Sequence, residues 1–104
     1  MPQTRRQIID QALTLSREML ALASDNDWDA LTAAAARRQS VMAAGFAAPI
    51  PESLRTYSIE AIERIQHYDK QISALVESNR DQTQKSLTEF HRGQKAARSY
   101  GLQE

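Results

Sequence analysis

The chain has 104 residues, of which 41% are hydrophobic and 25% charged, and this composition is ordinary for one folded domain. Thirteen acidic and thirteen basic side chains cancel, so no overall field attracts the chain to nucleic acid or to anionic lipid. The absence of Cys excludes disulfides, thiolate nucleophiles and Cys-based metal sites.

Targeting signals and catalytic motifs are also missing from the sequence. The basic pair Arg5–Arg6 precedes only two apolar residues, whereas a secretory signal needs roughly 7–15. No stretch approaches the ~18 apolar residues of a membrane-spanning helix. His67 and His91 lack metal-ligand spacing, and no Ser, His or Asp stands in a recognisable nucleophile context. We expect a cytoplasmic protein that is not an enzyme, has no cofactor or metal, and does not insert into membranes.

Glycine and proline divide the chain into helical stretches. Both are absent from residues 3–44 and from residues 52–92, and the segment between these stretches contains both. No hairpin signal lies between alternating apolar runs. The sequence therefore predicts an all-α fold, an antiparallel three-helix bundle with a long third helix and a weak C-terminal helical extension, in one domain over residues 1–104.

The first two predicted helices form a hairpin. A helix over residues ~4–24 has one broad apolar face with Ile8, Ala12, Leu15, Met19 and Leu22. In the polar break that follows, Asn26 tolerates the left-handed conformation and Asp27 can cap the next helix. That helix, over residues ~28–44, carries a stripe of Trp28, Leu31, Ala35, Arg38 and Met42.

The third predicted helix covers residues ~51–90 and begins at Pro51, whose fixed φ suits the first helical position. Its apolar stripe fades after Val76, so a C-terminal extension over residues ~91–104 is expected to be the least stable part. The stripe contains Leu54, Ala61, Ile62, Ile65, Tyr68, Ile72, Leu75 and Val76.

Antiparallel pairing outward from the second loop predicts an overlong third helix. It places Met42 near Leu54, Ala35 near Ala61 or Ile62, and Trp28 near Tyr68 or Asp69. The aliphatic residues Ile72, Leu75 and Val76 would then extend past the bundle, and each would forgo about 1.5–3 kcal/mol if left in water. A second copy of the chain, a folded-back C-terminal segment or a partner helix could cover them. A longer first helix, or a bend near residues 82–83 that closes a four-helix bundle, would remove the need for a partner.

Asp69 lies on the apolar stripe of the third helix, where an unpaired carboxylate would be costly to bury. The pairing scheme makes the indole N–H of Trp28 and the guanidinium of Arg38 its nearest donors. Asp69 can therefore fix the register of the helices or contact a partner directly.

Three motifs, in order along the chain, resemble the flagellar FliT-type export chaperones. The stretch from Met19 to Leu31 resembles the first hairpin turn of that family, with a short polar break before Trp-Asp-x-Leu. Residues 68–72 resemble its mid-helix segment, and residues 92–101 resemble its basic C-terminal motif ending in Tyr-Gly.

The resemblance implies a cytoplasmic helical chaperone that binds the filament-cap protein and delivers it to the export ATPase complex. Some members also restrain a flagellar transcription regulator. It further implies a masking segment that contains Arg98 and Tyr100. The implied partner-binding face consists of Leu31, Ala35, Arg38, Ile65, Tyr68, Asp69, Ile72, Leu75 and Val76.

Two other functions remain open at this point. A structural homo-oligomeric helical module, such as a homodimer, would bury the aliphatic strip permanently and have no chaperone activity. A nucleic-acid-binding bundle would require steeply salt-dependent affinity, for which the neutral charge gives little support.

Overall fold

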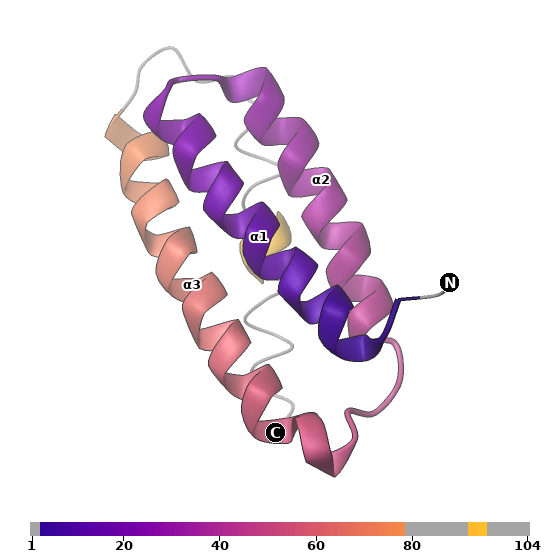
Figure 1. Cartoon of the computed structure of the whole chain (residues 1–104). Helices are drawn as coiled ribbons and strands as arrows, with labels where there is room; N and C mark the ends of the chain where they lie inside the picture. The colour runs from indigo at the N-terminus through magenta and orange to yellow at the C-terminus, as the bar shows by residue number, and fades with distance from the viewer. Residues whose placement is uncertain (1–2, 79–91, 96–104) are drawn as a thin grey trace.

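Three antiparallel helices pack into an elongated bundle (Figure 1). The structure is a computed structural model and describes residues 3–78 and 92–95. It contains α1 (Arg5–Ser24), α2 (Trp28–Gly45), the short 3-10 helix η1 (Glu52–Leu54) and α3 (Arg55–Ser78). The prediction of an all-α three-helix bundle is confirmed. None of the helices in this described part has the length and hydropathy needed to span a bilayer.

Local polar groups set the ends of the first hairpin. Thr4 caps α1 in a capping box. Its hydroxyl accepts from the backbone N–H of Gln7 at 3.1 Å, and the side-chain Oε1 of Gln7 accepts from the backbone N–H of Thr4 at 2.9 Å. Asn26 adopts the left-handed region at φ 59°, and the Asp27 carboxylate accepts from the Ala30 amide at 3.3 Å. The predicted roles of Asn26 and Asp27 in reversing the chain are therefore confirmed.

The second connection is longer than the first and changes where α3 begins. Pro51 precedes η1, and α3 starts only at Arg55. The connection is held against the start of α1, since the Arg5 guanidinium donates to the carbonyls of Ala48 and Pro49 at 3.3 and 3.4 Å. Nearby, the Tyr57 hydroxyl donates to Asp10, and the Arg6 guanidinium lies 4.6 Å from the centre of the Tyr57 ring. These contacts fix the first turn of α3 beside the first turns of α1.

The predicted register between α2 and α3 is wrong by about three helical turns. Ala35 was expected opposite Ala61 or Ile62, but it shares a cluster with Ile72, eleven residues beyond Ala61. Trp28 likewise lies with Val76. The physical reason is the connection, which lets α3 begin beyond the end of α2 and then run along its full length.

The prediction that aliphatic residues extend past the bundle is therefore wrong. Ile72 is 0% exposed and Val76 is 1% exposed, and both pack with Met19 and Trp28 at the α1–α2 turn. Leu75 is half-buried against the same cluster. The strip on which the homo-oligomer alternative depended is thus covered in a single chain. The predicted continuation of the third helix over residues 79–90 lies outside the described residues.

The core has two apolar clusters separated by one polar layer. The loop cluster, near the α2–α3 connection, consists of Ala12, Met42 and Ile65. The polar layer of Ser16, Arg38 and Asp69 lies between the clusters in all three helices. The hairpin cluster, near the α1–α2 turn, consists of Met19, Ala23, Trp28, Leu31, Ala34, Ala35, Ile72 and Val76.

Candidate partner-binding site

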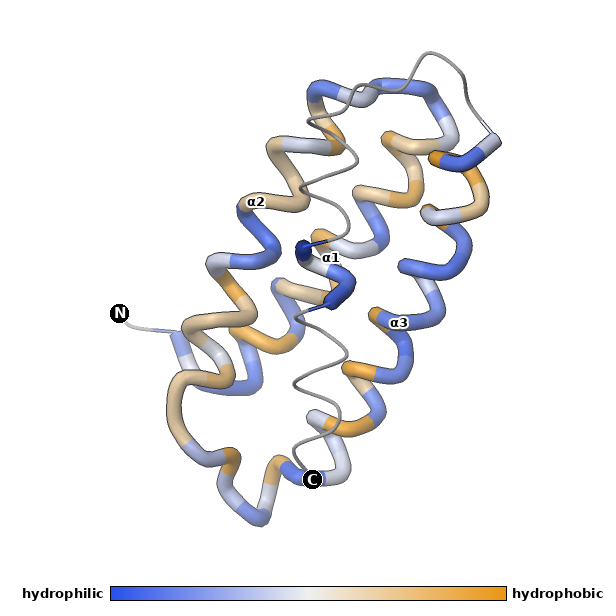
Figure 2. The backbone as a smooth tube through the Cα atoms, turned by 180° about the vertical axis from the view of Figure 1, so that it is seen from behind, coloured by the Kyte–Doolittle hydropathy of each residue, from blue (hydrophilic) through white to orange (hydrophobic). Residues whose placement is uncertain are grey.

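The line along which α2 and α3 face each other, here called the α2–α3 seam, is the candidate site. Helix α1 packs closely against both α2 and α3, whereas these two come near each other at few backbone positions. Seen from behind, residues 92–95 lie in front of the space between α2 and α3, with α1 on the far side (Figure 2). Residues 92–95 are helical, and we call them the C-terminal segment.

A buried ion pair forms the centre of the seam. Nη1 of Arg38 donates to Oδ1 of Asp69 at 2.7 Å, and Nη2 donates to Oδ2 at 3.4 Å. Their side chains are 0% and 1% exposed. Of the two donors expected for Asp69, the indole of Trp28 and the guanidinium of Arg38, the structure confirms Arg38. The pair joins α2 to α3 inside the core, and this placement is the one expected if Asp69 fixes the register of the helices, one of the two roles considered for it.

Ser16 of α1 completes the polar layer. Its hydroxyl donates to the Ala12 carbonyl at 2.9 Å and accepts from Nη1 of Arg38 at 3.1 Å. The guanidinium is thus hydrogen-bonded by Ser16 on α1 and Asp69 on α3, and it lies between the loop cluster and the hairpin cluster. Its Nε is buried and has no hydrogen-bond partner in the part of the chain that the structure describes.

The C-terminal segment contacts both helices of the seam. Gly93 is buried, and a Cβ atom built on it would lie 3.0 Å from Nη2 of Arg38 on α2. On the other side, Nε2 of Gln94 donates to the Ser73 hydroxyl of α3 at 3.4 Å. The segment therefore bridges α2 and α3 directly over the ion pair.

The structure brings most of the predicted binding residues together, but it places them inside the bundle. Tyr68 and Leu75 are half-buried and are the two with accessible surface. The two predicted masking residues, Arg98 and Tyr100, lie outside the described residues. The buried residues of the predicted face are Leu31, Ala35, Arg38, Ile65, Asp69, Ile72 and Val76.

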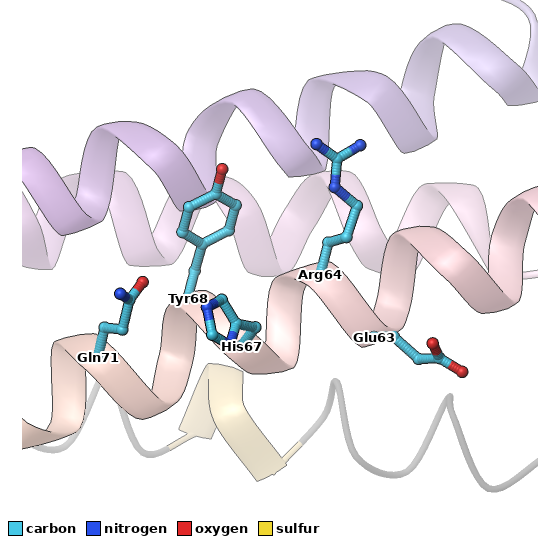
Figure 3. Close-up of a pocket in the computed structure, with 5 residues that line it drawn as sticks. All are labelled: Glu63, Arg64, His67, Tyr68 and Gln71. Atoms are coloured by element: carbon cyan, nitrogen blue, oxygen red, sulfur yellow. The ribbon is translucent and has the colours of Figure 1, made fainter.

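The accessible residues lie on a different side of α3 from the C-terminal segment. In Figure 3, Tyr68 and Arg64 extend from α3 toward α1, while the C-terminal segment runs along the opposite side of the helix. Leu75 is seven residues after Tyr68 and so shares its side. Tyr68 also lines an open hollow of about 440 Å³ with Glu63, Arg64, His67 and Gln71. Since one helix supplies these residues and none of them is buried, the hollow is a surface feature with no enclosed polar site.

Sequence reasoning missed two members of the site. Ser16 is a small polar residue on the apolar face of α1, between Ala12 and Met19, and this position is the signal that could have identified it. Gly93 gave no comparable signal, because its role depends on which side chain lies opposite it. Among the described residues, no group of three or more His, Cys, Asp and Glu side chains could hold a metal ion.

Comparison with known proteins gives one result. The family model described as "Flagellar protein FliT" matches residues 6–102. The match covers α1 from its second residue onward, all of α2 and α3, and the C-terminal segment. No curated protein and no solved structure matches significantly.

Proposed function

Because this chain belongs to the FliT family, a family of flagellar export chaperones, we propose that it binds the flagellar filament-cap protein before export. The family match over residues 6–102 carries this proposal, since it covers nearly the whole 104-residue chain. In the proposed sequence of events, the chaperone holds the cap protein in the cytoplasm and delivers it to the export ATPase complex. A flagellar transcription regulator is a further proposed partner.

The α2–α3 seam is the proposed binding surface for a helical segment of the cap protein. A helix can bind another helix by laying an apolar stripe into the space between two neighbours. The position of residues 92–95 supports this choice, because a helical segment already contacts both α2 and α3 there. Tyr68 and Leu75 lie on the side of α3 that is turned toward α1, so the proposed face continues from the seam around α3 to reach them.

The buried members of the proposed face require a change in the chain before they can touch a partner. Arg38, Asp69 and Ile72 are at most 1% exposed. We propose that the C-terminal segment, together with Arg98 and Tyr100, masks the seam, and that the partner displaces it. Such an exchange needs only a modest difference in affinity between the two occupants.

Substitution of Leu75 tests the part of the proposed face that lies outside the seam. Leu75→Asp places a charge on the accessible side of α3, and we expect affinity for the cap protein's terminal helical segment to fall by about tenfold or more. Leu20→Asp is a matched control, because Leu20 is also half-buried against the hairpin cluster but belongs to α1. Calorimetric titration of both variants measures the effect.

The control separates a local effect from loss of the fold. Equal losses of affinity in the two variants would attribute the effect to the core. Unchanged affinity of Leu75→Asp would refute the extension of the proposed face to Tyr68 and Leu75. Ile72→Asp is unsuitable for this purpose, because Ile72 is 0% exposed and an ionised carboxylate there would destabilise the bundle itself.

A further inference from the structure

The close contact between Gly93 and Arg38 leaves no room for a side chain at position 93. A Cβ atom at position 93 would lie 3.0 Å from Nη2, 3.9 Å from Cζ and 4.0 Å from Nε of Arg38. A separation of 3.0 Å between a carbon and a nitrogen is well inside ordinary van der Waals contact. Every residue larger than glycine would therefore press on the guanidinium.

Arg38 has little freedom to move away from such a side chain. Both terminal nitrogens are bonded to the Asp69 carboxylate, and Nη1 is also bonded to Ser16. The side chain is 0% exposed and lies between two packed apolar clusters. Displacing the guanidinium would stretch these bonds inside the core, where no water can replace them.

Backbone conformation does not explain the glycine. Gly93 is helical, and its φ is not positive. In a helix, alanine is favoured over glycine by about fivefold, because glycine loses more backbone entropy. The property that suits Gly93 to this position is therefore the absence of a Cβ atom, which allows the backbone to lie against Arg38.

We propose that Arg38 selects by size what can lie on the α2–α3 seam, and that Gly93 is the residue by which the chain's own C-terminal segment meets this requirement. The ion pair thus holds Arg38 in place against whatever lies on the seam, in addition to joining α2 and α3 in the core. A consequence that rests on the proposed function is that a partner helix occupying the seam presents a glycine at the level of Arg38.

The absence of Cys from the chain provides a direct assay for the seated segment. Ser73→Cys places one thiol where Gln94 contacts α3, so seating of the segment protects it from a maleimide reagent. Ser40→Cys, at an exposed position on α2, reports any general change in reactivity. The labelling rate of the first thiol relative to the second measures the fraction of time that the segment is away.

Alanine at position 93 tests the proposal by the direction in which the labelling rate changes. If Arg38 filters by size, Gly93→Ala raises the labelling rate of Ser73→Cys several-fold, although alanine favours the helix. In an Arg38→Lys background, the lysine ammonium can still pair with Asp69 but has no atom in the place of Nη2. There, Gly93→Ala is expected to lower the labelling rate of Ser73→Cys below that of the Arg38→Lys chain that keeps Gly93. A lower rate in both backgrounds would overturn the proposal.

A larger side chain gives a second test that leaves Arg38 unchanged. Gly93→Leu is expected to raise the labelling rate by about tenfold or more, and an unchanged rate would overturn the proposal. A synthetic peptide with the sequence of residues 86–104, added to the Gly93→Leu chain, is expected to restore protection. The same peptide carrying Gly93→Leu is expected to have no effect, and equal protection by both peptides would also overturn the proposal.

None of these measurements uses the cap protein. Failure of the size requirement at Arg38 would leave cap-protein binding to be judged by calorimetric titration of the native chain. Conversely, failure of every variant to bind the cap protein would refute the proposed function without changing the labelling result.

Discussion

Replacement of Asp69 by leucine should show how strongly the polar layer depends on being complete. Asp69→Leu removes the two carboxylate oxygens that accept from the Arg38 guanidinium and leaves the Ser16 hydroxyl as its remaining acceptor among the described residues. The guanidinium would still be 0% exposed in the native packing. A buried charge without its counter-ion costs about 3–5 kcal/mol, out of a total stability of about 5–15 kcal/mol for a domain.

The double variant Arg38→Met/Asp69→Leu separates the cost of an orphaned charge from the value of the pair. With both charges removed, apolar side chains fill the layer, and Ser16 still donates to the Ala12 carbonyl. Replacement of a whole buried pair by apolar residues is often neutral or stabilising, by up to about 4 kcal/mol. We therefore expect the double variant to be at least as stable as the native chain.

Urea unfolding provides the assay. Trp28 is the only tryptophan and is 7% exposed in the hairpin cluster, so its fluorescence reports the packing of all three helices. With a slope of about 1–3 kcal/mol per molar urea, the single variant should lower the midpoint by about 2 M. If Asp69→Leu unfolds at the native midpoint, or if the double variant is as unstable as the single one, then the pair is not buried as described.

Three further substitutions test other parts of the fold by the same urea assay. Ile72→Ala removes a fully buried side chain from the hairpin cluster and should cost about 2–5 kcal/mol, whereas a cost below about 1 kcal/mol would place Ile72 at the surface. Thr4→Ala removes the hydroxyl that caps α1 and should cost about 0.5–2 kcal/mol, with Thr14→Ala on the exposed face of the same helix as the control. Asn26 lies at φ 59°, a conformation that alanine adopts less readily than asparagine or glycine, so Asn26→Ala should cost about 1 kcal/mol and Asn26→Gly should be nearly neutral. Equal stability of the two variants would argue against the left-handed conformation.

The helices and their caps could be read from the sequence because their signals are local. A run without glycine or proline, a residue such as Thr4 or Asp27 that can cap, and an apolar stripe act within one or two turns of chain. Asn26 likewise tolerates the left-handed conformation because of its residue type. The pairing of Arg38 with Asp69 was also within reach, because two charges on apolar stripes need each other wherever the helices meet.

The axial register could not be read in the same way. An apolar stripe repeats with every turn, so sliding α3 along α2 by about three turns buries an equivalent set of faces. The choice between registers depends on the path of the connection, on contacts such as that of Tyr57 with Asp10, and on the ion pair. These links join residues that are 31 or more positions apart, and the pattern within one helix contains no record of them.

The amino-acid sequence by itself determined that this protein is helical, where α1 and α2 begin and end, and which faces of the helices avoid water. Tertiary structure alone decided that Ile72 and Val76 are core residues, that Ser16 completes the polar layer, and that Gly93 lies against Arg38. The physical reason is that helix formation and capping depend on neighbours along the chain. Burial, ion pairing and close approach depend on neighbours in space, which differ for each register of the same helices.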